Sequence, residues 1–130
     1  MKVISIKQPW ASLIINGYKK YEFRTWKTKY RGEILIHASK SFDKKLIEYF
    51  SEYNLDYPTG CIIGKVNLNN CIPITEKFEN TLIKTNKKVY GLTQGRSGYA
   101  FELTEVQKFE NPIEINGKLG IWDYDGIIKK

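Results

Sequence analysis

The chain has 130 residues, a formal net charge of +7 and a pI near 9.3, and we expect a single domain over residues 1–130 with a core that needs no disulfide. The chain has one histidine and two cysteines, which are too few for a structural zinc site, and we expect the cysteines to be reduced thiols. We therefore expect no metal and no cofactor. There is no signal peptide and no apolar run long enough to span a membrane, so we expect a cytoplasmic location. The positive charge and the aromatic content of 14% favour nucleic acid as a partner, although a solvated lysine-rich surface has the same composition.

The first predicted elements are a short strand over residues 3–6 and a helix from Pro9 to Asn16. Proline suits the first turn of a helix, and Gly17 suits a left-handed cap at its end. Trp10 lies at helical spacing from Leu13, so it is either a core anchor or a residue that stacks on a ligand. A helix that ends at glycine and runs directly into charges is typical of the wall of a binding cleft.

Residues 19–26 predict a second strand with an unusual charged face. Alternation places Glu22, Arg24 and Trp26 on one face and Lys19 on the other. Lys19 joins the charged face only if the backbone is irregular after Gly17. These charges form either a ligand-binding wall or a weak ion pair at the surface.

A basic, aromatic connection over residues 25–31 leads to a third strand, residues 33–38. The connection ends in Arg31 and suits either contact with nucleic acid or a solvated hairpin. His37, the single histidine, is either a structural hydrogen-bonding residue or a reserve acid or base.

The middle of the chain predicts a helix over residues 41–53, with Ser39 or Ser41 as its cap and an aromatic stripe in the core. A strand over residues 60–68 follows and extends toward residue 74, and a short helix opens at residues 75–79. Residues 82–96 have a weak pattern with several lysines, which indicates either a mobile basic loop or lid, or disorder without function.

The last third predicts a strand over residues 98–103 that continues or pairs with residues 106–109, a turn at Asn111–Pro112, a hairpin at Asn116–Gly117, and a last strand over residues 119–122. Two helices among about six strands, with glycine bends throughout, predict an α+β fold: a small β-barrel of about six strands with two or more covering helices. The sequence contains neither a phosphate-binding glycine loop nor a nucleophile elbow.

Several segments together resemble the ASCH domain family, named for homology to activating signal cointegrator and placed in the PUA-like superfamily. They are residues 5–11, 17–26, 30–32, 36–40, 98–101 and 117–122. The resemblance implies a PUA-like barrel with a cleft that binds RNA or a modified nucleoside. Lys19, Glu22 and Arg24 match the cleft motif of the family, whereas residues 41–97 match no motif.

The resemblance also implies an enzymatic alternative. A branch of small bacterial members deacetylates N4-acetylcytidine with a lysine that aligns with Lys19, a threonine where this chain has Glu22, and a further glutamate. The threonine is therefore missing here, and Glu76 and Glu79 are only positional candidates for the further carboxylate. Ribonuclease activity has also been proposed within the family.

We therefore weigh three hypotheses. In the first, cations attract phosphate, tryptophans stack on a base and Glu22 accepts from an exocyclic amine. The ligand-binding residues would be Trp10, Lys19, Glu22, Arg24, Trp26, Arg31, His37, Lys40 and Trp122. In the second, Lys19 and Glu22 are the acid–base pair of a small amidohydrolase or ribonuclease. In the third, Glu22 and Arg24 only stabilise the mouth of the barrel.

Overall fold

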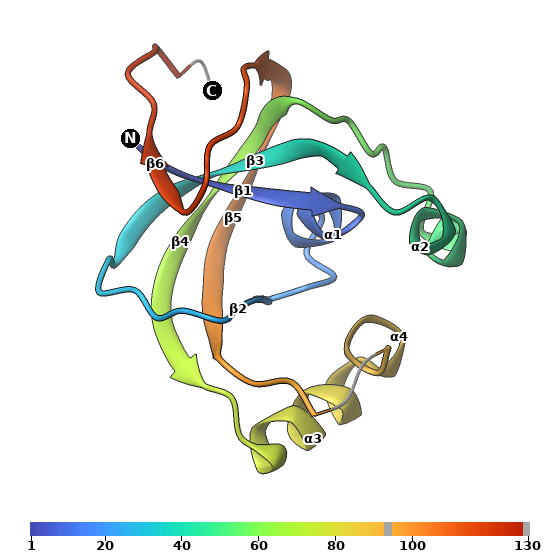
Figure 1. Ribbon diagram of the computed structural model, residues 1–130. Helices are drawn as coiled ribbons and strands as arrows, with labels where there is room; N and C mark the ends of the chain where they lie inside the picture. The colour runs from blue at the N-terminus through green and yellow to red at the C-terminus, as the bar shows by residue number, and fades with distance from the viewer. Residues whose placement is uncertain (93–94, 129–130) are drawn as a thin grey trace.

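The computed structural model describes residues 1–92 and 95–128, which form one mixed six-stranded sheet accompanied by short helices (Figure 1). The strands are β1 (Lys2–Gln8), β2 (Tyr21–Arg24), β3 (Gly32–Phe42), β4 (Cys61–Pro73), β5 (Tyr99–Glu114) and β6 (Ile121–Asp123). The helices are α1 (Trp10–Ile15), α2 (Lys44–Tyr49), α3 (Glu76–Thr85) and α4 (Lys87–Tyr90), with a 3-10 turn at Ser51–Tyr53. The strand order is β2-β5-β4-β3-β1-β6, in which only the β1–β3 pair is parallel.

The sheet curls around α1 but is not closed into a barrel, because β2 and β6 lie at opposite ends of the strand order (Figure 1). A side chain bridges the open side. The backbone pairing of β1 with β6 covers only Lys2 to Ile4, and the carbonyl of the next residue, Ser5, accepts from Arg24 Nη2 of β2 at 2.8 Å. The predicted α+β class is thus confirmed, and the predicted barrel closure is not.

Helix α1 fills the concave side of the sheet. Residues 11–15 are all buried, and Ala11, Ile14 and Ile15 among them pack in one cluster with buried isoleucines such as Ile4 and Ile36. The fit is tight at Gly64 in β4, because a Cβ there would lie 2.7 Å from Ile15 Cδ1 and 2.6 Å from a backbone oxygen. Only glycine allows β4 to approach the helix this closely.

The end of α1 sets the direction in which the chain enters the candidate site. Gly17 has a φ of +85°, and the N–H groups of Tyr18 and Lys19 both donate to the carbonyl of Leu13, at 2.9 and 3.1 Å. This confirms Gly17 as the left-handed residue that ends the helix. Lys19 therefore belongs to the turn and precedes β2, so the alternation of the strand does not govern its side chain.

The helix predicted over residues 41–53 is shorter than expected. β3 continues to Phe42, whose backbone pairs with Gln8, and α2 begins only after Asp43, whose carboxylate accepts from the backbone N–H of Leu46 at 3.1 Å. Phe42 is 55% exposed, so the predicted aromatic core stripe was wrong there; Phe50 is the aromatic residue of this segment that is fully buried. The side-chain cap at Asp43 explains why α2 begins at Lys44, later than the predicted start at residue 41.

The weak pattern of residues 82–96 predicts a mobile loop or disorder, but the structure places much of this segment in two helices. Thr75 caps α3 and Asn86 caps α4, through side-chain oxygens that each accept from a backbone N–H three residues on, at 3.1 Å. Residues 93 and 94 lie outside the described part of the chain. Caps of this kind organise short helices even where the apolar pattern is weak.

The two turn predictions near the C-terminus were wrong. β5 runs through Asn111 and Pro112 as one strand, and its register against β4 jumps from Lys108 to Ile113, so the proline lies in the bulge, where no ladder donor is needed. Residues 116–117 connect β5 to β6, which pairs with β1 rather than with β5, so they form no hairpin.

Candidate functional site

Three charged side chains around β2 form the centre of the candidate site. Lys19 Nζ lies 3.0 Å from Glu22 Oε1, and Arg24 Nη2 lies 3.1 Å from Glu22 Oε2. Lys19 Nζ also donates to the backbone carbonyl of Tyr21. The side chains of Lys19 and Glu22 are only 3% and 11% exposed. The structure thus brings together the three residues of the predicted cleft motif, through the irregular turn after Gly17.

The environment of Lys19 disfavours its charge. Burial lowers the pKa of the Lys19 amine, the Glu22 carboxylate opposes this, and the cations of Arg96 and Arg24 lower it further. Lys19 Nζ also lies 4.7 Å from the ring centroid of Phe23 and 5.7 Å from that of Trp10, where a cation is favoured by the aromatic faces. Lys19 is therefore a buried amine held between a carboxylate and two rings.

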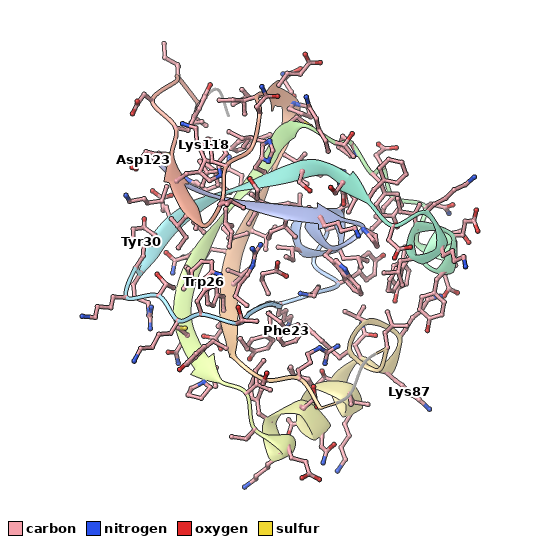
Figure 2. The ribbon with its side chains drawn as sticks, viewed as in Figure 1. Phe23, Trp26, Tyr30, Lys87, Lys118 and Asp123 are labelled. Atoms are coloured by element: carbon pink, nitrogen blue, oxygen red, sulfur yellow. The ribbon has the colours of Figure 1, made fainter. Side chains whose placement is uncertain are left out.

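A cavity of about 280 Å³ opens beside this amine, and we call it the aromatic pocket. Its lining residues are Trp10, Lys19, Glu22, Phe23, Val89 and Arg96. Trp10 belongs to α1, Phe23 to β2 and Val89 to α4, so the pocket lies between elements that are distant in sequence. Figure 2 shows Phe23 close to β2 on the side that faces the α3–α4 region. The volume of the aromatic pocket is near the lower limit of small-molecule sites, roughly 300 Å³.

The sequence interpretation did not identify Arg96 as a site residue. Its guanidinium carbon lies 4.5 Å from the ring centroid of Phe23, and its Nη1 lies 3.1 Å from Glu79 Oε2. The Glu79 carboxylate also accepts from the backbone N–H groups of Gly95 and Arg96, at 2.8 and 3.2 Å. An arginine between two glycines directly before a strand was the available signal.

These contacts bear on the predicted further carboxylate. Glu79 is 6% exposed and its oxygens hold the chain around Arg96, while Glu76 is exposed on the first turn of α3. Glu79 thus reaches the aromatic pocket through the side chain of Arg96.

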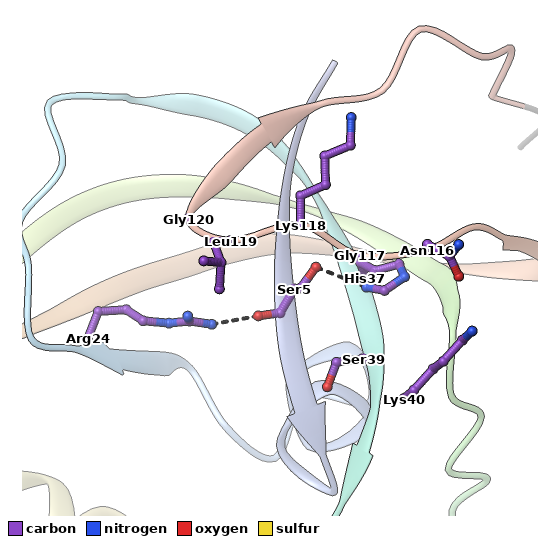
Figure 3. A pocket seen from close by; sticks show the side chains of 10 residues that line it. All are labelled: Ser5, Arg24, His37, Ser39, Lys40, Asn116, Gly117, Lys118, Leu119 and Gly120. Carbon is purple, nitrogen blue, oxygen red and sulfur yellow. Dashed lines mark hydrogen bonds between the residues drawn. The ribbon is translucent and has the colours of Figure 1, made fainter.

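Arg24, which pairs with Glu22, also lines a second cavity, of about 480 Å³ (Figure 3). We call it the basic pocket. It is lined by Ser5, Arg24, His37, Ser39, Lys40 and residues 116–120, among which Lys118 contributes another cation. Arg24 connects the two pockets, because its guanidinium contacts Glu22 of the aromatic pocket and the Ser5 carbonyl of the basic pocket.

Ser5 and His37 form the floor of the basic pocket, and Trp122 contacts both of them but is not itself among the lining residues. His37 Nε2 lies 2.7 Å from the carbonyl oxygen of Ile115, and because a carbonyl can only accept, Nε2 is the nitrogen that carries the hydrogen. His37 Nδ1 lies 3.0 Å from Ser5 Oγ. Ser5 Oγ also accepts from Trp122 Nε1 at 3.1 Å. His37 is 1% exposed and Trp122 is 6% exposed. Protein partners occupy both ring nitrogens, which favours the structural role for His37.

The remaining predicted residues lie on the connection between β2 and β3. Trp26 is half-buried, with its ring centroid 5.3 Å from that of Phe101, and Arg31 is exposed and donates to the carbonyls of Thr28 and Tyr30 at 2.9 and 2.8 Å. Figure 2 shows Trp26 and Tyr30 along this connection. Neither Trp26 nor Arg31 lines the two pockets, whereas Trp10 lines the first and Lys40 the second.

Within residues 1–92 and 95–128, no three side chains of the metal-ligating types gather closely enough to hold an ion. No helix in the same ranges has the length and hydrophobicity to cross a bilayer.

Comparison with known proteins gives relatives in sequence and in fold. Activating signal cointegrator 1 from Homo sapiens is 29% identical over 137 residues, and that protein from Mus musculus is 28% identical. Each match covers 96% of this chain and 22% of the relative, so this chain spans less than a quarter of their length.

The crystal structure of ASCH from Zymomonas mobilis has the same fold, with a TM-score of 0.57 at 22% sequence identity over 87% of this chain and 72% of that one. A mutant of that protein gives a TM-score of 0.56 over 87% of this chain and 74% of its own. The sequence model of the ASCH domain matches residues 4–113, which include all three charged residues at the centre of the site. This chain therefore belongs to the ASCH domain family.

Proposed function

We propose that the protein binds RNA or a modified nucleoside across the aromatic and basic pockets. The observation that carries this proposal is the arrangement around Glu22, which separates a pocket lined by Trp10 and Phe23 from one lined by three cations, Arg24, Lys40 and Lys118. A nucleotide joins a base to a phosphate through its sugar, and these two surfaces match the base and the phosphate.

The aromatic pocket supplies groups that recognise a base. Trp10 offers an aromatic face, Glu22 offers carboxylate lone pairs to an exocyclic amine, and Arg96 presents a planar guanidinium that is already stacked on Phe23. A volume of about 280 Å³ suits a single base better than a large ligand. Stacking of a base on an aromatic face contributes about 1–3 kcal/mol.

The charge of the whole chain supports an anionic ligand. The net charge is +7, and three of the cations that it includes, Lys27, Lys29 and Arg31, lie on the exposed connection between β2 and β3. Such a surface raises the rate of association with a polyanion and makes the affinity fall as salt is added. We include Trp26 and Arg31 of this connection in the proposal as contacts of a longer strand.

The test is the affinity for a fluorescein-labelled single-stranded RNA 12-mer of mixed sequence, measured by anisotropy at several salt concentrations. We expect Arg24→Gln to weaken binding at least tenfold, because Arg24 contacts both pockets. The matched control is Lys87→Gln, which removes one cation from α4, where Figure 2 shows Lys87 pointing outward. Equal loss in both variants would contradict binding at the cleft.

The alternative is hydrolysis of an acylated cytidine by Lys19 and Glu22, and the observation that favours it is the lowered pKa of the Lys19 amine. Against it, Lys19 Nζ already donates to Glu22 and to the Tyr21 carbonyl. Incubation with N4-acetylcytidine separates the two functions, because release of acetate that is lost in Lys19→Met and in Glu22→Gln would establish the hydrolase.

A further inference from the structure

The basic pocket is distinguished by the sign of its charges. Its lining residues include three cationic side chains, Arg24, Lys40 and Lys118, and no carboxylate. Glu114 lines a neighbouring depression that shares Lys40 and Asn116 with the basic pocket. The pocket lined by Ser5 and Arg24 is therefore a local concentration of positive charge within a concave surface, where an anion is attracted more strongly than on a flat surface.

Arg24 has hydrogen-bond donors to spare. A guanidinium has five N–H donors, and both bonds that Arg24 makes to the protein, to Ser5 O and Glu22 Oε2, come from Nη2. Arg24 Nε is enclosed and has no partner, and Nη1 has none among the described residues either. The unpaired Nη1 donors of a half-buried arginine favour an oxyanion as the missing acceptor. Figure 3 shows the guanidinium directed toward Ser5 in this pocket.

The wall opposite Arg24 is held close to the pocket floor. A Cβ on Gly117 would lie 2.7 Å from Ser5 Oγ and 2.8 Å from His37 Cε1, so the backbone at Gly117 packs directly on these side chains. The hydrogen bonds of Ser5, His37 and Trp122 keep that floor in one arrangement. Lys118 lines the pocket, its Nζ lies 5.7 Å from the ring centroid of Trp122, and the flexible four-carbon stem of a lysine allows this amine to turn toward an anion in the pocket.

We propose that the basic pocket is a phosphate site, and hence that the ligand is a phosphorylated one, an RNA strand or a nucleotide, and not a free nucleoside. This inference rests on the proposed function, because the phosphate site adjoins the aromatic pocket through Arg24. It adds two points that the proposed function leaves open: the base and the phosphate have separate sites, and Lys40 and Lys118 are part of the phosphate site.

The test compares ligands that differ only in phosphate. Cytidine, cytidine monophosphate and an RNA 8-mer with or without a 5′ phosphate are titrated by NMR or anisotropy into the wild type, Lys40→Ala, Lys118→Ala and the control Lys87→Ala. We expect the wild type and the control to bind the monophosphate at least tenfold more tightly than cytidine. In Lys40→Ala and Lys118→Ala this ratio should fall threefold or more, with the affinity for cytidine unchanged.

The comparison of the two RNA 8-mers shows whether the bound phosphate is a terminal or a backbone phosphate. A preference for the 5′-phosphorylated 8-mer that is lost in Lys118→Ala indicates a terminal phosphate. Equal binding of the two 8-mers, with a salt slope that falls by about 0.7 in Lys118→Ala, indicates a backbone phosphate.

Failure of the inference and failure of the function give different results. RNA binding that is weakened by Arg24→Gln but is the same in Lys40→Ala, Lys118→Ala and Lys87→Ala overturns the phosphate site and leaves the function standing. The absence of binding by any nucleoside, nucleotide or RNA overturns both. Inorganic phosphate that shifts the NMR signals of Gly117 and Arg24 Nε in the wild type, but not in Lys118→Ala, supports the site independently of any base.

Discussion

Lys19 shows how a single residue can hold a charge inside the protein at a cost. Its side chain is 3% exposed, and burial lowers the pKa of its amine below the ordinary value of 10.5. Glu22 opposes that shift and is itself shared with Arg24. Two cations therefore depend on one carboxylate, whereas the carboxylate keeps a partner if either cation is removed.

This arrangement predicts how stability varies with pH. Between the lowered pKa of folded Lys19 and 10.5, the unfolded chain binds more protons than the folded chain, so the free energy of unfolding gains a contribution that increases with pH. Burial raises the pKa values of Tyr90 and Cys61, which act in the opposite direction at high pH. We therefore expect wild type to gain stability relative to Lys19→Met between pH 7 and pH 10, measured by urea unfolding.

Glu22→Gln is the matched variant for this prediction. It removes the group that raises the pKa of Lys19, so the increase in the free energy of unfolding with pH should begin at a lower pH. At pH 7 the free energy of unfolding should fall by about 3 kcal/mol, because a buried charge loses its partner. Parallel pH profiles for wild type and Lys19→Met would contradict a lowered pKa for Lys19.

At the scale of elements, α3 positions the segment that leads into β5. Glu79 on its first turn accepts from the backbone N–H groups of Gly95 and Arg96 and from the Arg96 side chain, and Arg96 in turn lies over Phe23. Gly98 adds a close contact, because a Cβ there would lie 2.3 Å from the backbone oxygen of Arg24. One wall of the aromatic pocket is thus positioned by a helix through a single carboxylate.

Removal of that carboxylate should loosen the wall. In Glu79→Gln we expect faster hydrogen exchange at the amides of Gly95 and Arg96, together with weaker RNA binding by about threefold to tenfold, because Arg96 loses its ionic partner. Exchange monitored by NMR and the anisotropy assay test this. Glu76→Gln is the control, since Glu76 is an exposed glutamate in the same turn of α3. If the two variants behave alike, Glu79 does not position Arg96.

At the scale of the whole molecule, three buried clusters support one sheet. One lies between α1 and the sheet, one surrounds Trp122, and one includes Leu13, Phe50 and Leu82. Trp10 packs against both the first and the third cluster. This sharing supports the proposal that residues 1–130 are a single domain.

A single domain should unfold in one cooperative step. Leu13 is completely buried in the third cluster, and Leu13→Ala should lower the free energy of unfolding by about 3 kcal/mol. We expect the midpoints of the unfolding transitions followed by tryptophan fluorescence and by far-UV circular dichroism to shift by the same denaturant concentration. The reason is that Trp122, in another cluster, unfolds together with Leu13. Separate transitions for the two signals would show that the clusters unfold independently.

The sequence by itself determined the features that depend on local chemistry. The left-handed Gly17 at the end of α1, the placement of Glu22 and Arg24 on one face of β2, and the apolar β3 core all follow from rules that act over a few residues. The motif of the ASCH family lies in the same stretch, so the centre of the candidate site and the α+β class were predictable.

Only the tertiary structure decided which distant residues complete the site. Arg96 reaches Phe23 because Glu79 of α3 holds its backbone, and Lys118 reaches the basic pocket because β6 pairs with β1 instead of forming a hairpin with β5. The side chain of Arg24, bonded to Ser5, bridges the side on which the sheet does not close. These outcomes depend on contacts between residues 17 to 117 positions apart, whose free energies no local pattern records.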